Sequence, residues 1–521
     1  MRGPFALLLA SVALLAGCVT PGAGLQDAGA GAVDISAPGA AASVVHKLGD
    51  ATARATDAVK PLLFDVGHDA AEPTLGVLAD GTLFYAAATF DNELCTPAVC
   101  LPRTDILRSA DGGASWEDVT PYFPGGVVRE HPETGDPYVY VDTQTSRVFD
   151  IDQRVATTCY TVVTSDDRGD TWTVPPSPAC VAPGMADHQT IVAAKPRMLP
   201  TSPLYPKIVY VCYNVVATSA CTRSLDGGTT FETTGPVGSR GVDASRVGPG
   251  IIAPNMSDPL NPDVDSQAVC SSLVGHLRAA ADGTVYLPRR ECNEGLVFIT
   301  QDDGTTWQRV KVADGLLGLG GTAGMDPALA LDASGNVYYL FQSADGRLKL
   351  ATSTDAGQTW SEPVDVLAPG LTWGNLATMA AGADGNVVLA YYGSSVANGT
   401  NATSEEIENA TWSGYVTLVQ DALTPSPTFT TTRVNPADDP LYRGACGIGR
   451  CGSVRDFIDV VIDADGRPWV TFIDACIDEC AAPDGTYEDS TSFTGVLATL
   501  AEGPNLLEPA RRLVPVHPAS G

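Results

Sequence analysis

The chain repeats a pattern of two short apolar runs separated by a tight turn. The clearest copies are residues 73–88, 276–288, 327–341, 377–392 and 459–474. Asp-Gly or Gly-Asn between β-rich runs predicts a β-hairpin, because these pairs tolerate the positive φ angles of the turn. Less regular copies occupy 137–151 and 189–216. Seven hairpins, spaced by roughly 40 to 80 residues, predict a repeated all-β unit.

An eight-residue motif, Ser/Thr-x-Asp-x-Gly-x-Thr/Ser-aromatic, follows five of these hairpins. The copies begin at Ser109, Ser165, Ser224, Thr300 and Ser353. The Asp can accept hydrogen bonds from amides of its own turn, and the Gly supplies a positive φ. The closing Trp or Phe gives the next strand an apolar anchor. An enzyme needs one active site and not five, so the repeated Asp is expected to be structural.

The motif resembles the Asp box of the sialidase-type β-propellers, over residues 70–370. The resemblance implies an all-β propeller fold, and the seven hairpins predict a seven-bladed β-propeller with Asp-box turns between the third and fourth strands. Blades are expected to begin near residues 72, 136, 187, 273, 326, 375 and 456. A six-bladed ring is the alternative, because known sialidases have six blades. Either Arg511–Val516 or Pro61–Val66 is expected to complete the last blade, the second by closing the ring.

The N-terminal residues predict export. Residues 1–18 combine Arg2 with an apolar stretch too short to span a bilayer. They end in Leu-Ala-Gly-Cys, which resembles a lipobox with Cys18 as the lipidated residue; an ordinary signal peptide is the alternative. Residues 19–56 are rich in Ala and Gly and are expected to be a flexible tether. The propeller is assigned to residues 57–521, and the protein to the cell surface or periplasmic side.

The cysteines also point to an oxidising compartment. Twelve remain when Cys18 is set aside, and they fall into near neighbours along the chain. No CxxC spacing or accompanying His pair favours a zinc site. The simplest pairing is Cys95–Cys100, Cys159–Cys180, Cys212–Cys221, Cys270–Cys292, Cys446–Cys451 and Cys476–Cys480.

A formal net charge of −31 argues against nucleic-acid binding, which requires a basic face. The membrane is expected to be contacted through the lipid anchor alone, and the protein to be a monomer. The expected partner is a glycan or another cell-surface ligand.

Loop lengths predict which face carries the function. The insertions 89–104, 238–270, 394–412 and 474–492 all fall on the face that collects the second-to-third loops and the links between blades. Variable loops on a rigid scaffold often carry binding and catalytic residues. The turns of the opposite face are short, with the exception of 194–207 in the third blade.

Charged residues stand where the innermost strands begin, at the mouth of the central channel. They are Glu72, Asp136, Asp187, His188, Asp326, Arg455 and Asp456. Carboxylates that converge there suit a hard cation such as Ca²⁺, for which Asp136 and Asp326 are the candidate ligands. Alternatively they act as a general acid and base, with Glu72 and Asp456 as the candidates. The structural alternative is that each acid accepts hydrogen bonds from free amides at its strand start.

Sialidases carry an arginine clamp for the substrate carboxylate and a Tyr–Glu nucleophile pair. The resemblance implies a clamp drawn from Arg289, Arg290, Arg443 and Arg455, with Asp187 and His188 beside it. Tyr442 is the candidate nucleophile. The first blade has Glu72-Pro73 where the family has Arg-Ile-Pro. The sequence therefore leaves three functions open: a sialidase-like glycoside hydrolase, a glycan-binding module, and a non-catalytic protein-binding or assembly scaffold.

Overall fold

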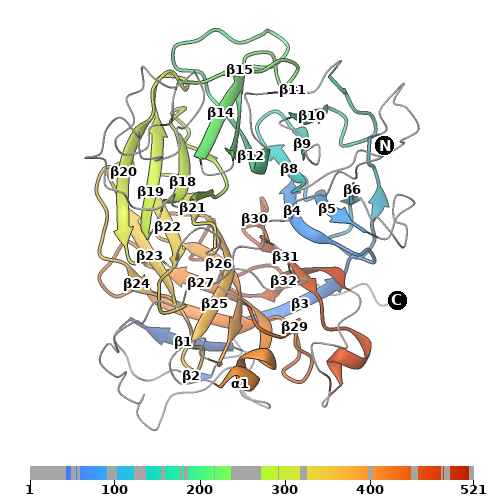
Figure 1. Cartoon of the computed structure of the whole chain (residues 1–521), viewed down its shortest axis with the longest axis vertical. Helices are drawn as coiled ribbons and strands as arrows, with labels where there is room; N and C mark the ends of the chain where they lie inside the picture. Colours follow the sequence, from blue (N-terminus) through green and yellow to red (C-terminus); the bar gives the residue numbers. More distant parts are fainter. Residues whose placement is uncertain are drawn as a thin grey trace, which may run out of the picture.

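Seven antiparallel sheets follow one another along the described residues and form the ring of a seven-bladed β-propeller (Figure 1). The computed structural model describes residues 43–48, 54–55, 59–90, 102–121, 136–153, 159–175, 179–180, 186–215, 218–235, 237, 272–291, 293–316, 325–396, 403–446, 454, 456–482, 485 and 493–515. The expected seven blades are thereby confirmed, and the six-bladed alternative is excluded.

The first three blades each have four strands. Blade 1 contains β4 (Ala71–Val77), β5 (Leu83–Thr89), β6 (Arg103–Ser109) and β7 (Glu117–Asp118). Blade 2 contains β8 (Tyr138–Asp142), β9 (Arg147–Gln153), β10 (Cys159–Ser165) and β11 (Ala179–Cys180). Blade 3 contains β12 (Ala186–Ala194), β13 (Ile208–Val215), β14 (Thr218–Ser224) and β15 (Glu232–Thr233).

The next two blades repeat this order. Blade 4 contains β16 (Ser272–Val274), β17 (Arg278–Ala279), β18 (Val285–Glu291), β19 (Glu294–Thr300) and β20 (Gln308–Asp314). Blade 5 contains β21 (Ala328–Leu331), β22 (Val337–Gln342), β23 (Leu348–Ser353) and β24 (Val364–Asp365).

The last two blades incorporate N-terminal strands. Blade 6 contains β25 (Trp373–Ala381), β26 (Val387–Ser394), β27 (Thr411–Gln420) and β28 (Thr428–Arg433), extended by β1 (Ser43–Lys47), β2 (Arg54–Ala55) and β29 (Tyr442–Arg443). Blade 7 contains β30 (Val460–Ile462), β31 (Pro468–Asp474), β32 (Thr494–Glu502) and β3 (Lys60–Asp65). The short helices are α1 (Ser404–Glu408) and η3 (Asp478–Ala481).

Strand β3 closes the ring. It lies beside β32 in Figure 1, and Pro61 pairs with Leu500 in their antiparallel register. The expected alternative, Arg511–Val516, forms no strand among the described residues and makes one isolated bridge, between Pro504 and Arg512. An outermost strand taken from near the other end of the chain therefore completes blade 7.

Part of the expected tether is ordered. Residues Ser43–Lys47 form β1, which adds to the outer edge of blade 6 through a five-residue register with β28. Val44 is fully buried there, and the Ser43 hydroxyl donates to Thr432 at 2.8 Å. The short Ser-Val-Val-His-Lys alternation is enough for an edge strand, although the surrounding Ala- and Gly-rich sequence concealed it.

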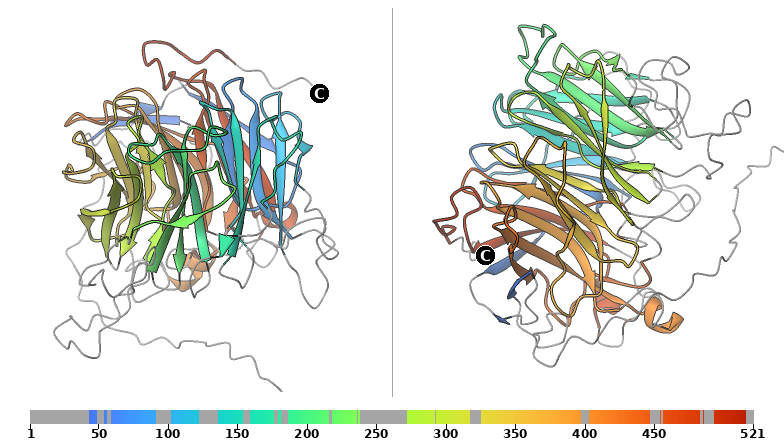
Figure 2. Two further views of the ribbon diagram at one scale, coloured as in Figure 1. Left: turned by 90° about the horizontal axis from the view of Figure 1, so that it is seen from above. Right: turned by 90° about the vertical axis from the view of Figure 1, so that its left-hand side faces the viewer.

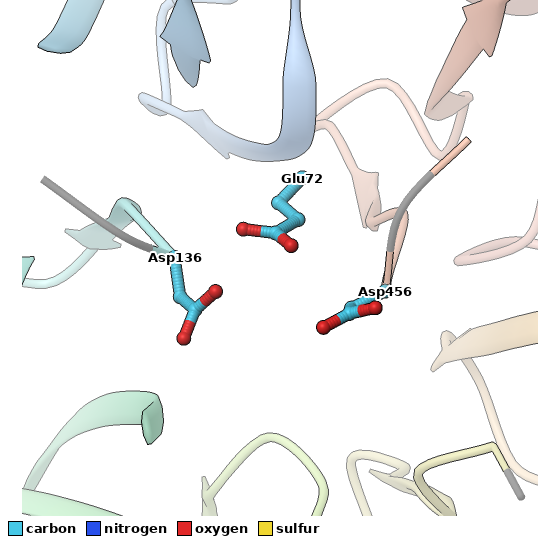
Figure 3. A group of neighbouring side chains, drawn as sticks. All are labelled: Glu72, Asp136 and Asp456. Atoms are coloured by element: carbon cyan, nitrogen blue, oxygen red, sulfur yellow. The ribbon is translucent and has the colours of Figure 1, made fainter. Parts of the chain in front are cut away.

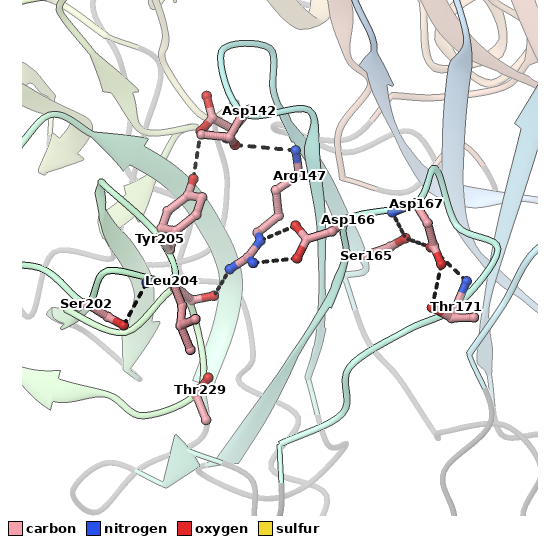
Figure 4. A network of polar contacts seen from close by, with 12 residues as sticks. Asp142, Arg147, Ser165, Asp166, Asp167, Thr171, Ser202, Leu204, Tyr205 and Thr229 are labelled. Atoms are coloured by element: carbon pink, nitrogen blue, oxygen red, sulfur yellow. Dashed lines mark hydrogen bonds and ion pairs between the residues drawn. The ribbon is translucent and has the colours of Figure 1, made fainter.

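The five motif copies form turns between the third and fourth strands of blades 1 to 5. Figure 4 shows one of them: Asp167 accepts from the Thr171 amide at 2.8 Å and from its hydroxyl at 2.6 Å, and the Ser165 hydroxyl donates to Asp167. The motif glycine packs against the preceding blade. At Gly304, where φ is +79°, a Cβ would lie 3.0 Å from Thr234. Each turn therefore joins two blades.

The propeller has two faces, which we name by their connections. The box face carries these motif turns and the turns between the first and second strands of each blade. The loop face carries the second-to-third loops, including α1, which lies at the lower edge of the left view of Figure 2. The β12–β13 connection, residues 195–207, is long for the box face.

Two of the expected disulfides lie within the described residues. Cys212–Cys221 joins β13 to β14, and Cys476–Cys480 closes a turn beside η3. Cys159 and Cys180 face each other in the β10–β11 register. The remaining three pairs include residues outside the described part of the chain. No helix in the described residues has the length and apolar character needed to cross a membrane.

Candidate functional site

The candidate site lies at the loop-face mouth of the channel, where the innermost strands begin. Glu72, Asp136 and His188 occupy these strand starts in blades 1, 2 and 3, and each has a positive φ, of 55°, 50° and 50°. The ladders of blades 1 and 3 shift register at the same place. A left-handed conformation costs a residue with a side chain about 1–3 kcal/mol and often marks a functional position. Here it gives three blades the same local backbone turn.

His188, on blade 3, contacts residues of three other blades. Its Nδ1 lies 2.7 Å from Asp326 in blade 5, and its Nε2 lies 3.1 Å from Asp456 in blade 7. Its backbone N–H donates to Asp136 in blade 2 at 2.9 Å. Burial opposes the charged imidazole, but the carboxylates of Asp326, Asp456 and Asp136 outweigh it and raise the pKa of His188 well above its ordinary value. His188 is therefore a doubly donating imidazolium at neutral pH.

Three carboxylates converge beside this histidine. Glu72, Asp136 and Asp456 each offer an oxygen within 4.8 Å of the other two, and all three point toward one space in Figure 3. Burial, followed by the charge of Asp136, raises the pKa of Glu72 well above its ordinary value. Glu72 therefore keeps its proton to a higher pH than an ordinary glutamate does, beside two other carboxylic side chains.

A second layer lies deeper in the channel. The His276 ring packs edge-on against Tyr138, with centroids 4.5 Å apart, and its Nδ1 lies 3.8 Å from Asp459. Burial and the charge of Arg278 lower the pKa of His276 well below its ordinary value. Burial raises the pKa of Asp459 to about 6. Arg278 and Asp459 are thus the titratable neighbours of an imidazole that disfavours the charged form.

The pocket at this mouth is small. Its walls come from blades 4 to 7 and include His276, Asp326, Leu376, Asp456 and Phe457, around a volume of about 20 Å³. That volume holds one or two waters or a single ion. A sugar ring would have to lie above the mouth, with only its reacting atoms reaching the carboxylates.

The arrangement suits two kinds of chemistry. A protonated Glu72 beside two acidic residues can deliver a proton to a leaving group. The oxygens of Glu72, Asp136 and Asp456 also suit a hard cation, which prefers carboxylate ligands. Asp326, a candidate metal ligand in the sequence, lies 2.7 Å from His188 Nδ1 and is not a member of this group of three. Only Asp136 of the two expected ligands lies in this carboxylate group.

The structure places several other candidates away from the mouth. Tyr442 is 1% exposed within the core that joins blades 6 and 7, and its hydroxyl donates to the Ala445 carbonyl at 3.4 Å. Arg443 donates to the carbonyls of Cys480 and Ala482 at 2.8 and 3.3 Å. Apolar neighbours therefore hold Tyr442, which we expected to be a nucleophile. Backbone carbonyls in and beside η3 hold Arg443, which we expected in a clamp.

Arg289 and Arg290 lie in β18 and are each 1% exposed. Burial lowers the pKa of Arg290, an effect that the nearby charge of Asp326 opposes. Both side chains are buried rather than exposed at the mouth, and Arg290 lies close enough to Asp326 of blade 5 for their charges to interact. Arg455 and the Asp187 side chain lie outside the described residues, as does Cys18.

No protein-family model and no curated protein matches the sequence. Solved structures similar to this chain include a Dyadobacter fermentans protein of unknown function, with 13% identity over 85% of this chain and 99% of that one and a TM-score of 0.40. They also include the NanB sialidase of Streptococcus pneumoniae, with 13% identity, 86% and 71% coverage and a TM-score of 0.37. A leech intramolecular trans-sialidase matches with 13% identity, 83% and 69% coverage and a TM-score of 0.36.

Proposed function

We propose that the protein is an exported propeller, lipid-anchored through Cys18, that acts on glycans at the loop-face mouth of its channel. The observation that carries the catalytic part is the cluster of Glu72, Asp136 and Asp456, in which burial and the charge of Asp136 raise the pKa of Glu72. Glycoside hydrolysis requires a carboxylic acid that donates and a second carboxylate that acts on the sugar. The Asp-box resemblance supports a glycan as the substrate class.

The test is turnover of a panel of fluorogenic glycosides, sialosides included, by the purified chain. Glu72→Gln should lower kcat by at least about 100-fold, because it removes the donated proton. Glu117→Gln is the matched control, since Glu117 is exposed on β7 and pairs with Arg108. Wild-type activity should decline as pH rises through the raised pKa of Glu72. Absence of turnover on every glycoside, or equal activity of the two variants, would contradict the catalytic proposal.

A non-catalytic role is the second candidate, and the close approach of three carboxylic groups favours it. A bound Ca²⁺ would relieve their mutual repulsion and would make the mouth a cation-supported binding surface. In that case chelation should lower the melting temperature, Ca²⁺ should restore it, and Glu72→Gln should abolish the effect of the metal. No glycoside would be hydrolysed.

The anchor has its own test. Cys18→Ser should move the protein from the membrane fraction to the soluble fraction, because acylation requires the thiol. Unchanged membrane association would count against lipidation at this residue.

A further inference from the structure

Of the two cavities described, the larger lies on the box face. A pocket of about 480 Å³ lies between blades 2, 3 and 4, at the opposite end of the channel from the carboxylate cluster. This volume falls in the range of small-molecule sites. The walls are the β8–β9 turn, the long β12–β13 connection and the end of β17. The short turns elsewhere on this face have no counterpart of the long connection.

The wall formed by residues 195–207 is fixed on both sides. On the blade 4 side, Asp303 accepts the backbone amides of Arg197, Met198 and Leu199 at 2.9, 2.6 and 2.7 Å. The Arg197 guanidinium also donates to Asp282 at 2.6 Å. Three consecutive amides on one carboxylate hold this segment in a single conformation. The cavity is therefore preformed.

On the blade 2 side the same connection is held by Asp142, which is 2% exposed. Tyr205 donates to Asp142 at 2.8 Å, as Figure 4 shows, and Thr145 donates to it at 2.7 Å. The Lys207 ammonium forms an ion pair with the same carboxylate. Asp142 is thus saturated with donors, and the paired Lys207 ammonium offsets its negative charge.

The cavity wall carries an excess of donors. Lys207 lends one of its three ammonium hydrogens to Asp142, and a lysine has no acceptor of its own. Lys195, which also lines the pocket, is exposed and makes no ion pair with any residue that the structure describes. The chain has a formal net charge of −31, so a cavity lined by two ammonium groups departs from its acidic composition.

We propose that this cavity is a binding site for a small hydroxylated carboxylate, such as a uronic acid. The two ammonium groups of Lys195 and Lys207 receive the carboxylate, because they are the charged donors in the wall that are not saturated. Thr143 and Gln144 on the β8–β9 turn supply polar contacts for the hydroxyls. Ala279, Ala280 and Ala281 form the opposite wall and leave the space into which a ring can fit. The site is independent of the loop-face cluster and of the function proposed for it.

The test is calorimetric titration of the purified chain with sodium glucuronate and with neutral glucuronamide. Glucuronate should bind with a Kd below about 10 mM, and glucuronamide at least about tenfold more weakly. Lys195→Ala should weaken glucuronate binding by about tenfold, and added salt should reduce it further. Lys60→Ala is the matched control, because Lys60 is an exposed lysine on β3 that pairs with Glu502. It should bind as the wild type does.

A second variant blocks the space. Ala281 is exposed at a turn and lines the cavity, so Ala281→Trp should fill the pocket without disturbing the fold. An unchanged melting temperature verifies the fold, and glucuronate binding should be lost. Glu72→Gln should bind glucuronate as the wild type does, which separates this site from the channel mouth. Undetectable binding of glucuronate to the wild type, or normal binding by Ala281→Trp, would overturn the proposal.

Discussion

The two ends of the channel use charge in opposite ways. At the loop-face mouth, His188 is shared by carboxylates of blades 5 and 7, and a second layer pairs His276 with Asp459 around a volume of about 20 Å³. At the box face, one carboxylate is saturated and two lysines line about 480 Å³. The loop-face charges stabilise the ring through one another. The box-face charges leave capacity for a ligand.

The comparison shows that the ring brings the loop-face residues together, whereas one long connection forms the box-face cavity. Strand starts from distant parts of the sequence meet at the loop-face mouth because blades are arranged around an axis. The box-face cavity depends on one departure from the repeat, the connection 195–207, and on the carboxylates that hold it. The largest effects on stability should therefore come from the loop-face mouth, and the smallest from the box-face lysine.

Removal of the shared histidine should have the largest effect. His188→Ala leaves Asp326 and Asp456 without their common cation and should lower the free energy of unfolding by about 3–5 kcal/mol, as when one partner of a buried pair is deleted. His68→Ala is the control: the His68 side chain is 41% exposed and 3.6 Å from Asp105, so about 1 kcal/mol or less is expected. The measurement is chemical denaturation. Similar losses of unfolding free energy in both variants would mean that His188 does not stabilise the contacts between the blades.

The pH dependence of stability should distinguish the groups whose pKa is raised in the folded state from those whose pKa is lowered. The raised pKa of His188 gives stability that is present below its ordinary value and is lost as pH rises through the raised value. Glu72 acts in the same direction, since its folded form retains its proton more strongly. The box-turn Asp355, whose turn hydrogen bonds lower its pKa to about 2, contributes stability above its ordinary value that is lost as pH falls through about 2.

Thermal unfolding at a series of pH values tests the predicted directions in which stability changes. The wild type should lose stability above about pH 6.5, the unfolded value of histidine, and His188→Ala should show a flatter alkaline limb. Asp355→Ala should flatten the acid limb alone. An alkaline limb of the same slope in His188→Ala would refute the assignment.

Loss of one box turn should have an intermediate effect. Asp226 accepts two amides and two hydroxyls in its turn, so Asp226→Ala should cost about 1–3 kcal/mol. Asp170→Ala removes an exposed partner of Arg108 and should cost less than about 1 kcal/mol. Any glycoside turnover at the loop-face mouth should be unchanged in Asp226→Ala, and its loss in a variant of normal melting temperature would place the active site on the box face.

The smallest effect is expected for Lys195→Ala. Because Lys195 is exposed and has no ion pair in the described residues, the free energy of unfolding should change by less than about 0.5 kcal/mol. Denaturation curves of this variant and the wild type should overlay. A large loss would show that Lys195 supports the fold, and its proposed ligand contact would then need another explanation.

The sequence predicted the ring and the members of the loop-face cluster for the same reason. Repeated hairpins place the blades, and an acid before the inner strand, as in Glu72-Pro73 and Asp136-Pro137, marks the channel mouth. What the sequence lacked was the direction of each side chain. The pairing of His188 with Asp326 and Asp456 depends on distances across the ring, which no local pattern encodes.

Two other features show why the position of Tyr442 and the box-face cavity were not predicted. Tyr442 was the candidate nucleophile, but packing beside Leu441 and Trp412 buries it, and tertiary packing of that kind cannot be read from spacing. Lys195 and Lys207 resemble ordinary surface lysines. The one available signal was the length of the connection between them on a face of otherwise short turns.

The pairing of β3 with β32 delays closure of the ring until the end of the chain has been synthesised. Pro61 pairs with Leu500, about 440 residues later in the chain. At a synthesis rate of about 5–20 residues per second, β3 would wait roughly 20–90 s for β32 to emerge from the ribosome. During that time β3 has no partner strand and its edge is open to other chains. A chain delivered across a membrane while still unfolded would meet its closing partner only after transport, so the ring would be sealed in the compartment where its disulfides form.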